Sequence, residues 1–217
     1  MLLSAVWILI AVVFCAAWYW FAMRHNRRRA FEVVHWIEGA LAGQGQVAGI
    51  RWLARSQFKV PLRLRHAGFN RAWMVVDLPP RELPLHWLLS KASHQREILT
   101  FEADLDLPPA FNLQVHNFRW FARSAWNGPN SRTPWDFEHS GPFVVSTRRD
   151  WKKEISSAMV TLANGGYREF TKIRFQRRSP HFSVTLPLES IAPGSPTRAC
   201  MFDSMRELAG SASTRLS

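Results

Sequence analysis

A run of 22 residues without a charged side chain, residues 2–23, constrains this chain more than any other feature of its sequence. As an α-helix that rises about 1.5 Å per residue, the run is about 33 Å long, enough to cross a hydrocarbon core of about 30 Å. A cleaved signal peptide begins with a cationic segment, whereas no Lys or Arg precedes this run. We therefore expect an uncleaved transmembrane anchor followed by a folded domain.

Aromatic and cationic residues follow the apolar run in the order typical of a membrane–water interface. The residues that we expect at this interface are Trp18, Tyr19, Trp20, Arg24, Arg27, Arg28 and Arg29. Because the cations lie only after the span, the positive-inside rule predicts an outside N-terminus and a cytoplasmic domain. We thus expect a single-pass protein of the inner (cytoplasmic) membrane. His25 lies in the same flank, and we interpret it as a solvated boundary residue.

Small side chains recur on one face of the predicted anchor, at intervals of seven and four residues. They are Ser4, Ala11, Cys15 and Ala22. Such a stripe would allow close approach of a second helix, because van der Waals packing is the main attraction between helices in lipid. Short spans are rich in small residues in any case, so chance placement is the competing interpretation.

The sequence predicts five regions. An anchor with its cationic flank (1–29) is followed by a juxtamembrane helix and a glycine hinge (30–46), two β-rich units (47–117 and 118–190), and a C-terminal linker, short helix and frayed tail (191–217). Within the second region, the pattern of residues 30–41 predicts a helix with one apolar face. That face carries Phe31, Val34, Ile37 and Leu41.

Matching segments about 70 residues apart suggest that the two β-rich units are duplicates. RWLARS at 51–56 recurs as RWFARS at 119–124, and HAG at 66–68 corresponds to HSG at 139–141. A strand, a helix (around 83–91 or 150–164) and a proline-led hairpin follow in the same order in each copy. The hairpins pair 99–105 with 111–115, and 169–176 with 181–188. We therefore predict an α+β fold in which each unit carries one helix.

The net charge of +12, from 28 Lys and Arg against 16 Asp and Glu, favours an anionic partner such as phospholipid or nucleic acid. Arginine alternates with aromatic residues in both RWxARS segments, which we expect to be strands with the tryptophans in the core. The candidates for binding phosphate groups are Arg51, Arg55, Arg119 and Arg123. The alternative is that these arginines are simply solvated.

The sequence carries no catalytic or cofactor-binding motif of the GxxxxGK[ST], GxSxG or HExxH type. Its two cysteines, Cys15 and Cys200, and its eight histidines lack the spacing of metal ligands. We therefore expect no catalytic residue, metal or cofactor. Glu102, Asp104 and Asp106 share one face of a predicted strand, where they could hold a cation or a basic partner, although a solvated face is the simpler interpretation.

These features favour a non-enzymatic accessory or scaffold subunit, whose cytoplasmic domain docks on other integral membrane proteins. Respiratory and photosynthetic complexes, which transduce energy, are one setting for such a subunit. Membrane lipids are a further expected partner. The second hypothesis is a membrane-tethered module that binds anionic lipid or nucleic acid through a basic Arg/Trp face. The third is an enzyme whose site is assembled from dispersed residues.

Overall fold

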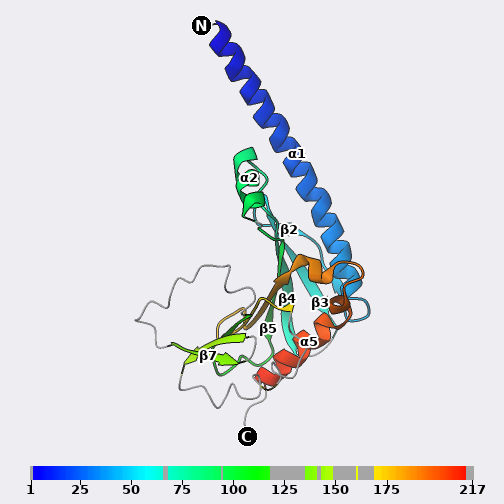
Figure 1. Ribbon diagram of the computed structural model, residues 1–217. Coiled ribbons are helices and arrows are strands. Elements are labelled where there is room, and N and C mark those ends of the chain that lie inside the picture. The colour runs from blue at the N-terminus through cyan, green and yellow to red at the C-terminus, as the bar shows by residue number, and fades with distance from the viewer. Residues whose placement is uncertain are drawn as a thin grey trace.

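The computed structural model describes residues 2–65, 68–93, 95–117, 135–140, 143–148, 160 and 169–213. A long N-terminal helix extends from a domain built on one large antiparallel sheet (Figure 1). Among these residues the helices are α1 (Leu2–Ala40), α2 (Pro84–Ala92), the 3₁₀ helix η3 (Leu188–Ile191) and α5 (Pro196–Ser213). The predicted α+β fold with an N-terminal apolar helix is therefore confirmed.

Helix α1 has two halves that differ in their surroundings. The sequence has neither Gly nor Pro before Gly39, so nothing interrupts the helix. Side chains 4–17 are exposed, and α1 is long and apolar enough to cross a membrane. The second half is buried along one face, formed by Ala22, Asn26, Ala30, Val33, Val34 and Ile37.

The sheet contains ten strands in the described part of the chain, and neighbouring strands run antiparallel. Their bounds are β1 Gly45–Val47, β2 Arg51–Trp52, β3 Gln57–Leu64, β4 Phe69–Asp77, β5 Ile98–Leu105, β6 Leu113–Asn117, β7 Trp135–Ser140, β8 Phe143–Arg148, β9 Lys172–Phe175 and β10 Phe182–Pro187. The strand order is β1-β3-β4-β5-β10-β9-β6-β8-β7, and β2 pairs with β3.

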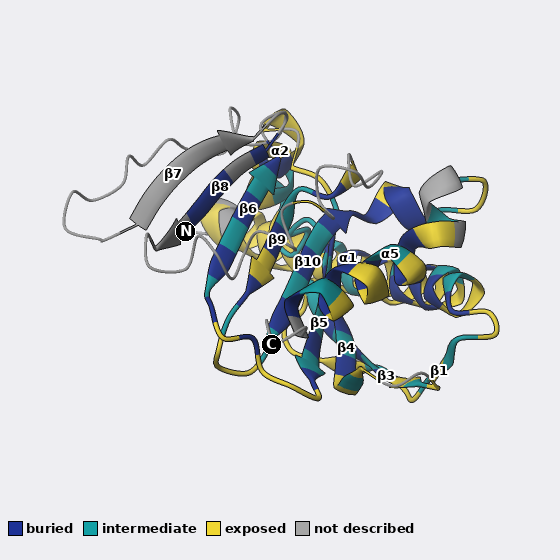
Figure 2. Cartoon of the chain, turned by 90° about the horizontal axis from the view of Figure 1, so that it is seen from below, coloured by how far each residue is buried: buried dark blue, intermediate teal, exposed yellow. Residues whose placement is uncertain are grey.

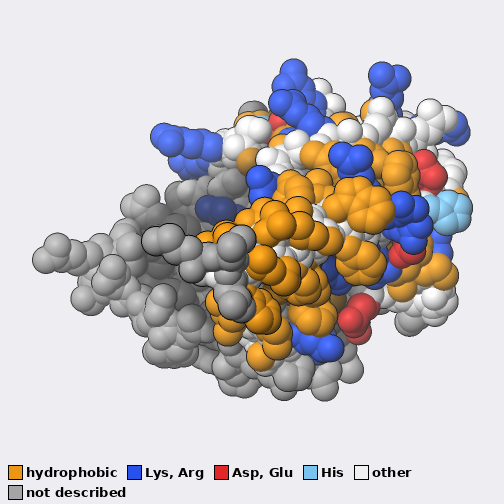
Figure 3. Space-filling model, turned by 90° about the horizontal axis from the view of Figure 1, so that it is seen from above, with side chains coloured by type: hydrophobic (Ala, Val, Ile, Leu, Met, Phe, Trp, Pro, Cys, Tyr) orange, Lys and Arg blue, Asp and Glu red, His pale blue; other side chains and the backbone are white. Residues whose placement is uncertain are grey.

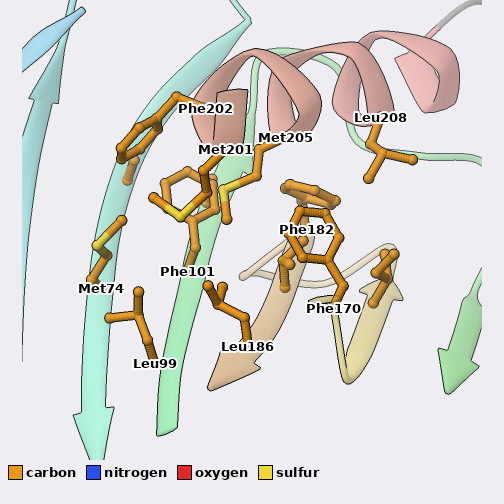
Figure 4. Packing of buried hydrophobic residues seen from close by; sticks show 14 of the residues in the cluster. Met74, Leu99, Phe101, Phe170, Phe182, Leu186, Met201, Phe202, Met205 and Leu208 are labelled. Atoms are coloured by element: carbon orange, nitrogen blue, oxygen red, sulfur yellow. The ribbon is translucent and has the colours of Figure 1, made fainter. Parts of the chain in front are cut away.

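One face of the sheet carries the core. Buried and half-buried side chains alternate along β5, β6 and β10, as expected where successive side chains point to opposite faces. The sheet curves around α5 and the second half of α1, which lie on the same side of it (Figure 2). Met201, Met205 and Leu208 of α5 point toward the strands (Figure 4), and Phe202 packs edge-on against Phe101 at 6.0 Å.

One of the two predicted hairpins is confirmed and the other is wrong. Strand β9 pairs with β10, but β5 and β6 are separated by β10 and β9. The connection from β5 to β6 is seven residues long, about 23 Å when extended, whereas crossing two intervening strands requires about 14 Å. The connection is therefore long enough for either arrangement, and the sheet order depends on packing elsewhere.

The duplication is not shown, and in the described part of the chain β10 and β9 of the second predicted unit lie between β5 and β6 of the first. The second RWxARS copy and most of the predicted helix 150–164 lie outside the described residues, as does His66. Gly43 lies in the turn after the packed part of α1, with a φ of +84° that favours glycine, Gly45 begins β1, and Gly49 follows that strand. They therefore lie inside the domain and not between the domain and the apolar half of α1.

The helix face predicted for residues 30–41 is partly correct. Val34, Ile37 and Leu41 are buried as expected, whereas Phe31 is 69% exposed and Ala30 and Val33 occupy the core instead. The buried face runs continuously from Ala22. This continuity fixes how α1 is rotated about its own axis, and therefore which side chains face the core. The C-terminal helix predicted as short within residues 191–217 is longer than expected, because α5 has 18 residues and closes the core.

Candidate membrane interface

Helix α2 lies beside α1 at the level where the apolar stretch of α1 ends. The indole Nε1 of Trp18 donates a hydrogen bond to the carbonyl oxygen of Arg81 at 3.1 Å. The rings of Trp18 and Trp87 meet edge to face, with centroids 5.6 Å apart. Figure 1 shows α2 projecting from the sheet toward the N-terminal half of α1. Trp18 therefore holds this projection against α1.

Helix α2 exposes its apolar side chains. Pro84 stands in the first turn, where a missing backbone N–H costs least. Of its residues only Ser90 is buried, and its hydroxyl donates to the Gln95 side chain at 3.0 Å. Four leucines here, which we call the leucine tip, are 53–67% exposed: Leu83, Leu85, Leu88 and Leu89. A helix on a globular domain normally turns such residues toward the core, and exposed apolar patches mark interaction sites.

Cationic side chains stack on aromatic residues of α1 at this level of the helix. The Arg24 guanidinium lies 5.3 Å from the Trp20 ring, and the Arg55 guanidinium lies 5.1 Å from the Tyr19 ring. Seen from the N-terminal end of α1, hydrophobic side chains gather on this face with Lys and Arg side chains around them (Figure 3). A groove of about 510 Å³ runs along α1 beside them, lined by Tyr19, Trp20, Met23, Arg24, Arg27, Arg28 and Phe31.

The predicted interface residues thus divide into two groups. Tyr19, Trp20, Arg24, Arg27 and Arg28 are exposed, as the prediction requires. Trp18 and Arg29 are instead engaged within the chain, Trp18 by Trp87 and the Arg81 carbonyl and Arg29 by Glu97.

An ion-pair network around Glu97 fixes the base of α2 to α1. Arg29 donates to one Glu97 oxygen through Nε at 3.0 Å and Nη2 at 2.7 Å, and Arg81 lies 3.7 Å from the other oxygen. Arg29 also donates to Glu32 at 2.9 Å. Partial desolvation, and then the positive charge of Arg81, lower the pKa of His25.

The first RWxARS segment is a hairpin turn and not a strand through Arg55. Strand β2 covers only Arg51 and Trp52, and then the chain bends so that the Leu53 and Ala54 amides both donate to the Gln57 carbonyl. Trp52 is exposed and packs on Phe58, so its predicted core position is wrong. The turn brings Arg55 to α1, where its carbonyl accepts a hydrogen bond from Asn26 at 3.3 Å.

Of the four phosphate-binding candidates, only Arg55 reaches this interface in the described part of the chain. Arg51 is exposed on β2, away from the aromatic groove that lines α1. Arg119 and Arg123 lie outside the described residues.

Sequence reasoning missed the leucine tip, although it predicted a helix around 83–91, which α2 confirms. The signal was an apolar Leu-Pro-Leu-His-Trp-Leu-Leu segment on a helix too short to be buried all round.

The small-residue stripe has a mixed environment. Ser4, Ala11 and Cys15 are exposed on the apolar half of α1, whereas Ala22 is buried against the domain. The small size of Ala22 thus serves packing within the chain. Contact between the other three residues and a second helix stays a prediction.

The described residues offer little support for acid–base chemistry. A cavity of about 420 Å³ is lined by Asn112, Leu113, Gln114, Arg174, Phe175, Gln176, Arg177 and Arg178, a set without a carboxylate or an imidazole. Glu102 accepts a hydrogen bond from the Trp73 indole at 2.5 Å, and Asp106 accepts one from the Gly68 amide at 2.9 Å. These carboxylates therefore serve the fold. Within the described ranges, no three residues are grouped to hold a metal ion.

Comparison with known proteins identifies no relative: no protein family model matches the chain, and no curated protein matches its sequence.

Proposed function

We propose that this protein is a non-enzymatic, single-pass accessory or scaffold subunit of the inner membrane, whose cytoplasmic domain docks on other membrane proteins. One observation carries the proposal: α1 is both the apolar segment and a core element of the domain. Residues 4–17 are exposed and apolar, and the same unbroken helix supplies buried side chains from Ala22 to Ile37.

This construction supports a scaffold because it holds the domain at a fixed angle to the anchor. A flexible linker would let a tethered domain sample many orientations. Here the helix continues from the span into the core, so a partner in the same membrane meets one orientation of the domain. Such preorganisation reduces the entropy lost on association. The same feature supports retention of the anchor, because signal-peptide cleavage would have to cut within this continuous helix.

The orientation rests on charge. Arg24, Arg27 and Arg28 are exposed immediately after the apolar stretch, and the positive-inside rule places such a cluster on the cytoplasmic side. A reporter fused to the C-terminus should therefore be active only in the cytoplasm. Periplasmic activity would contradict the topology.

The scaffold function is tested by purifying the full-length chain in mild detergent after crosslinking in cells. We expect an assembly larger than the 25.0 kDa chain that contains another integral membrane protein in a fixed ratio. Replacing Ala11 and Cys15 with Leu should weaken that assembly if the small-residue face packs on a partner helix, because wider side chains prevent close approach. The matched control replaces Val12 and Val13 with Leu. A monomer under all conditions would refute the scaffold function.

A second function, binding of anionic lipid, is favoured by the groove along α1. Three of its lining residues are the exposed arginines 24, 27 and 28, interleaved with Tyr19 and Trp20. Arginine offers bidentate donors to phosphate, and a basic segment next to a span attracts anionic headgroups. Affinity for phosphatidylglycerol that falls steeply with salt would support this function. The same affinity after Arg27→Gln and Arg28→Gln would contradict it.

A further inference from the structure

We infer that the leucine tip of α2 is a second membrane contact, which inserts into the interfacial region of the same leaflet from which α1 emerges. The inference rests on the proposed function, because it takes α1 as the anchor. Its occupant is the lipid bilayer itself. The tip would enter only the interfacial region and would not cross the membrane.

The depth of α2 follows from its contacts with α1. Trp18 touches both Trp87 and the Arg81 carbonyl. At about 1.5 Å per residue, Trp18 lies about 9 Å closer to the N-terminal end of α1 than Arg24, the first cation of the flank. If Arg24 lies among the headgroups, α2 lies at the level of the aromatic belt. At that level the four exposed leucines would contact lipid and not water.

Charge around the tip complements an anionic surface. Lys91 stacks on Trp87 at 5.2 Å, and Arg55 stacks on Tyr19. The nearby carboxylates are paired, because Glu97 is held by Arg29 and Glu82 lies 3.9 Å from Arg55. The tip therefore presents leucines with cations beside them, which is the combination that binds interfacial lipid.

A second membrane contact would restrict the orientation of the domain more than the anchor alone does. A single helix permits the domain to rotate about the helix axis and to tilt with it. A second insertion point beside α1 removes rotation, because α2 projects from one side of the helix only (Figure 1). The tip thereby selects which side of the sheet domain faces a neighbour in the membrane.

The test measures how deep the leucine tip lies in the bilayer, with the full chain in vesicles of phosphatidylcholine and phosphatidylglycerol. Cys15 and Cys200 are both exposed, so they are first replaced by Ala and Ser. A single cysteine at Leu88 then carries an environment-sensitive fluorophore. We expect its emission to shift to shorter wavelength and to lose intensity when the vesicles carry phosphatidylcholine with a nitroxide just below the headgroup.

Two matched positions make the result decisive. Val13→Cys reports the anchor and should be quenched most by a nitroxide deep in the acyl chains, and Gln46→Cys, on β1 beyond the far end of α1, should not be quenched. If Val13 is quenched and Leu88 is not, the inference fails while the anchor stands. If neither is quenched, the proposed function fails as well. An emission shift at Leu88 without nitroxide quenching would mean that protein covers the tip, which also overturns the inference.

Discussion

The role of α1 as a core element predicts that two substitutions on its second half differ sharply in their effect on stability. Ile37 is 0% exposed and Phe31 is 69% exposed. The sequence pattern alone placed both on the same apolar face, so the pair distinguishes the structure from the pattern. We expect Ile37→Ala to destabilise the domain strongly and Phe31→Ala to leave its stability nearly unchanged.

The magnitude follows from burial. Ile→Ala removes three carbon groups, each contributing about 0.8 kcal/mol when buried, or about 2.4 kcal/mol in total. The cavity left among the residues of α5 and the sheet adds to this, which places the cost within the range of about 2–5 kcal/mol known for such changes. Phe31 buries little of its side chain, so its truncation should cost less than about 0.5 kcal/mol.

The assay is urea unfolding of the full chain in detergent micelles, followed by tryptophan fluorescence. The anchor stays in the micelle, so the transition reports the domain, and an unchanged dependence on urea shows that the same surface unfolds in each variant. Equal losses of stability in both variants would refute the orientation of α1 about its axis, in which Ile37 faces the core and Phe31 faces outward. No loss in Ile37→Ala would refute its place in the core.

Two further predictions concern charged groups. Glu97→Gln should cost about 1–3 kcal/mol, because it leaves the half-buried Arg29 without its main carboxylate; Glu32→Gln, at an exposed partner of Arg29, should cost under about 1 kcal/mol by the same urea titration. Burial, and then the charge of Lys172, lower the pKa of His116 to about 4. The unfolded imidazole takes up its proton near pH 6.5, whereas the folded one does so only near pH 4. The contribution of the neutral imidazole to the free energy of unfolding is therefore complete above pH 6.5 and is lost as the pH falls toward 4. After discounting for partial solvation, this contribution amounts to about 1–2 kcal/mol. The free energy of unfolding should therefore depend less on pH in His116→Gln over this window, and an unchanged dependence would contradict the lowered pKa.

Features of the fold that depend on near neighbours in sequence could be predicted. The apolar run, its aromatic and cationic flank, and the alternation along β10 are all local patterns, and each corresponds to an observed element. Which strands pair with one another could not be predicted from local patterns. Strand β5 pairs with β10, whose residues lie about 80 positions later, and no pattern within β5 specifies that choice.

The RWxARS segment shows a second limit. Alternating residues predict a strand only if the backbone stays extended, and here the turn at Leu53–Ser56 reverses it to pair β2 with β3. That segment contains neither Gly nor Pro, the usual signals of a turn. The reversal is stabilised by the amides of Leu53 and Ala54 on one carbonyl, a backbone interaction that side-chain patterns do not report. Its result, the placement of Arg55 on Tyr19, was therefore not predictable from the sequence.

The leucine tip shows why the candidate site was harder to predict than the fold. Periodicity indicates whether apolar side chains share a face of a helix, but it does not indicate which medium covers that face. Residues 83–89 read alone fit a helix whose leucines pack on the sheet. The structure excludes this packing, because Ser90 is the buried residue and the leucines are exposed. The long-range contacts of Trp18 with Trp87 and with the Arg81 carbonyl relate those leucines to the level of the anchor, and from that level follows the expectation that lipid, not protein, covers them.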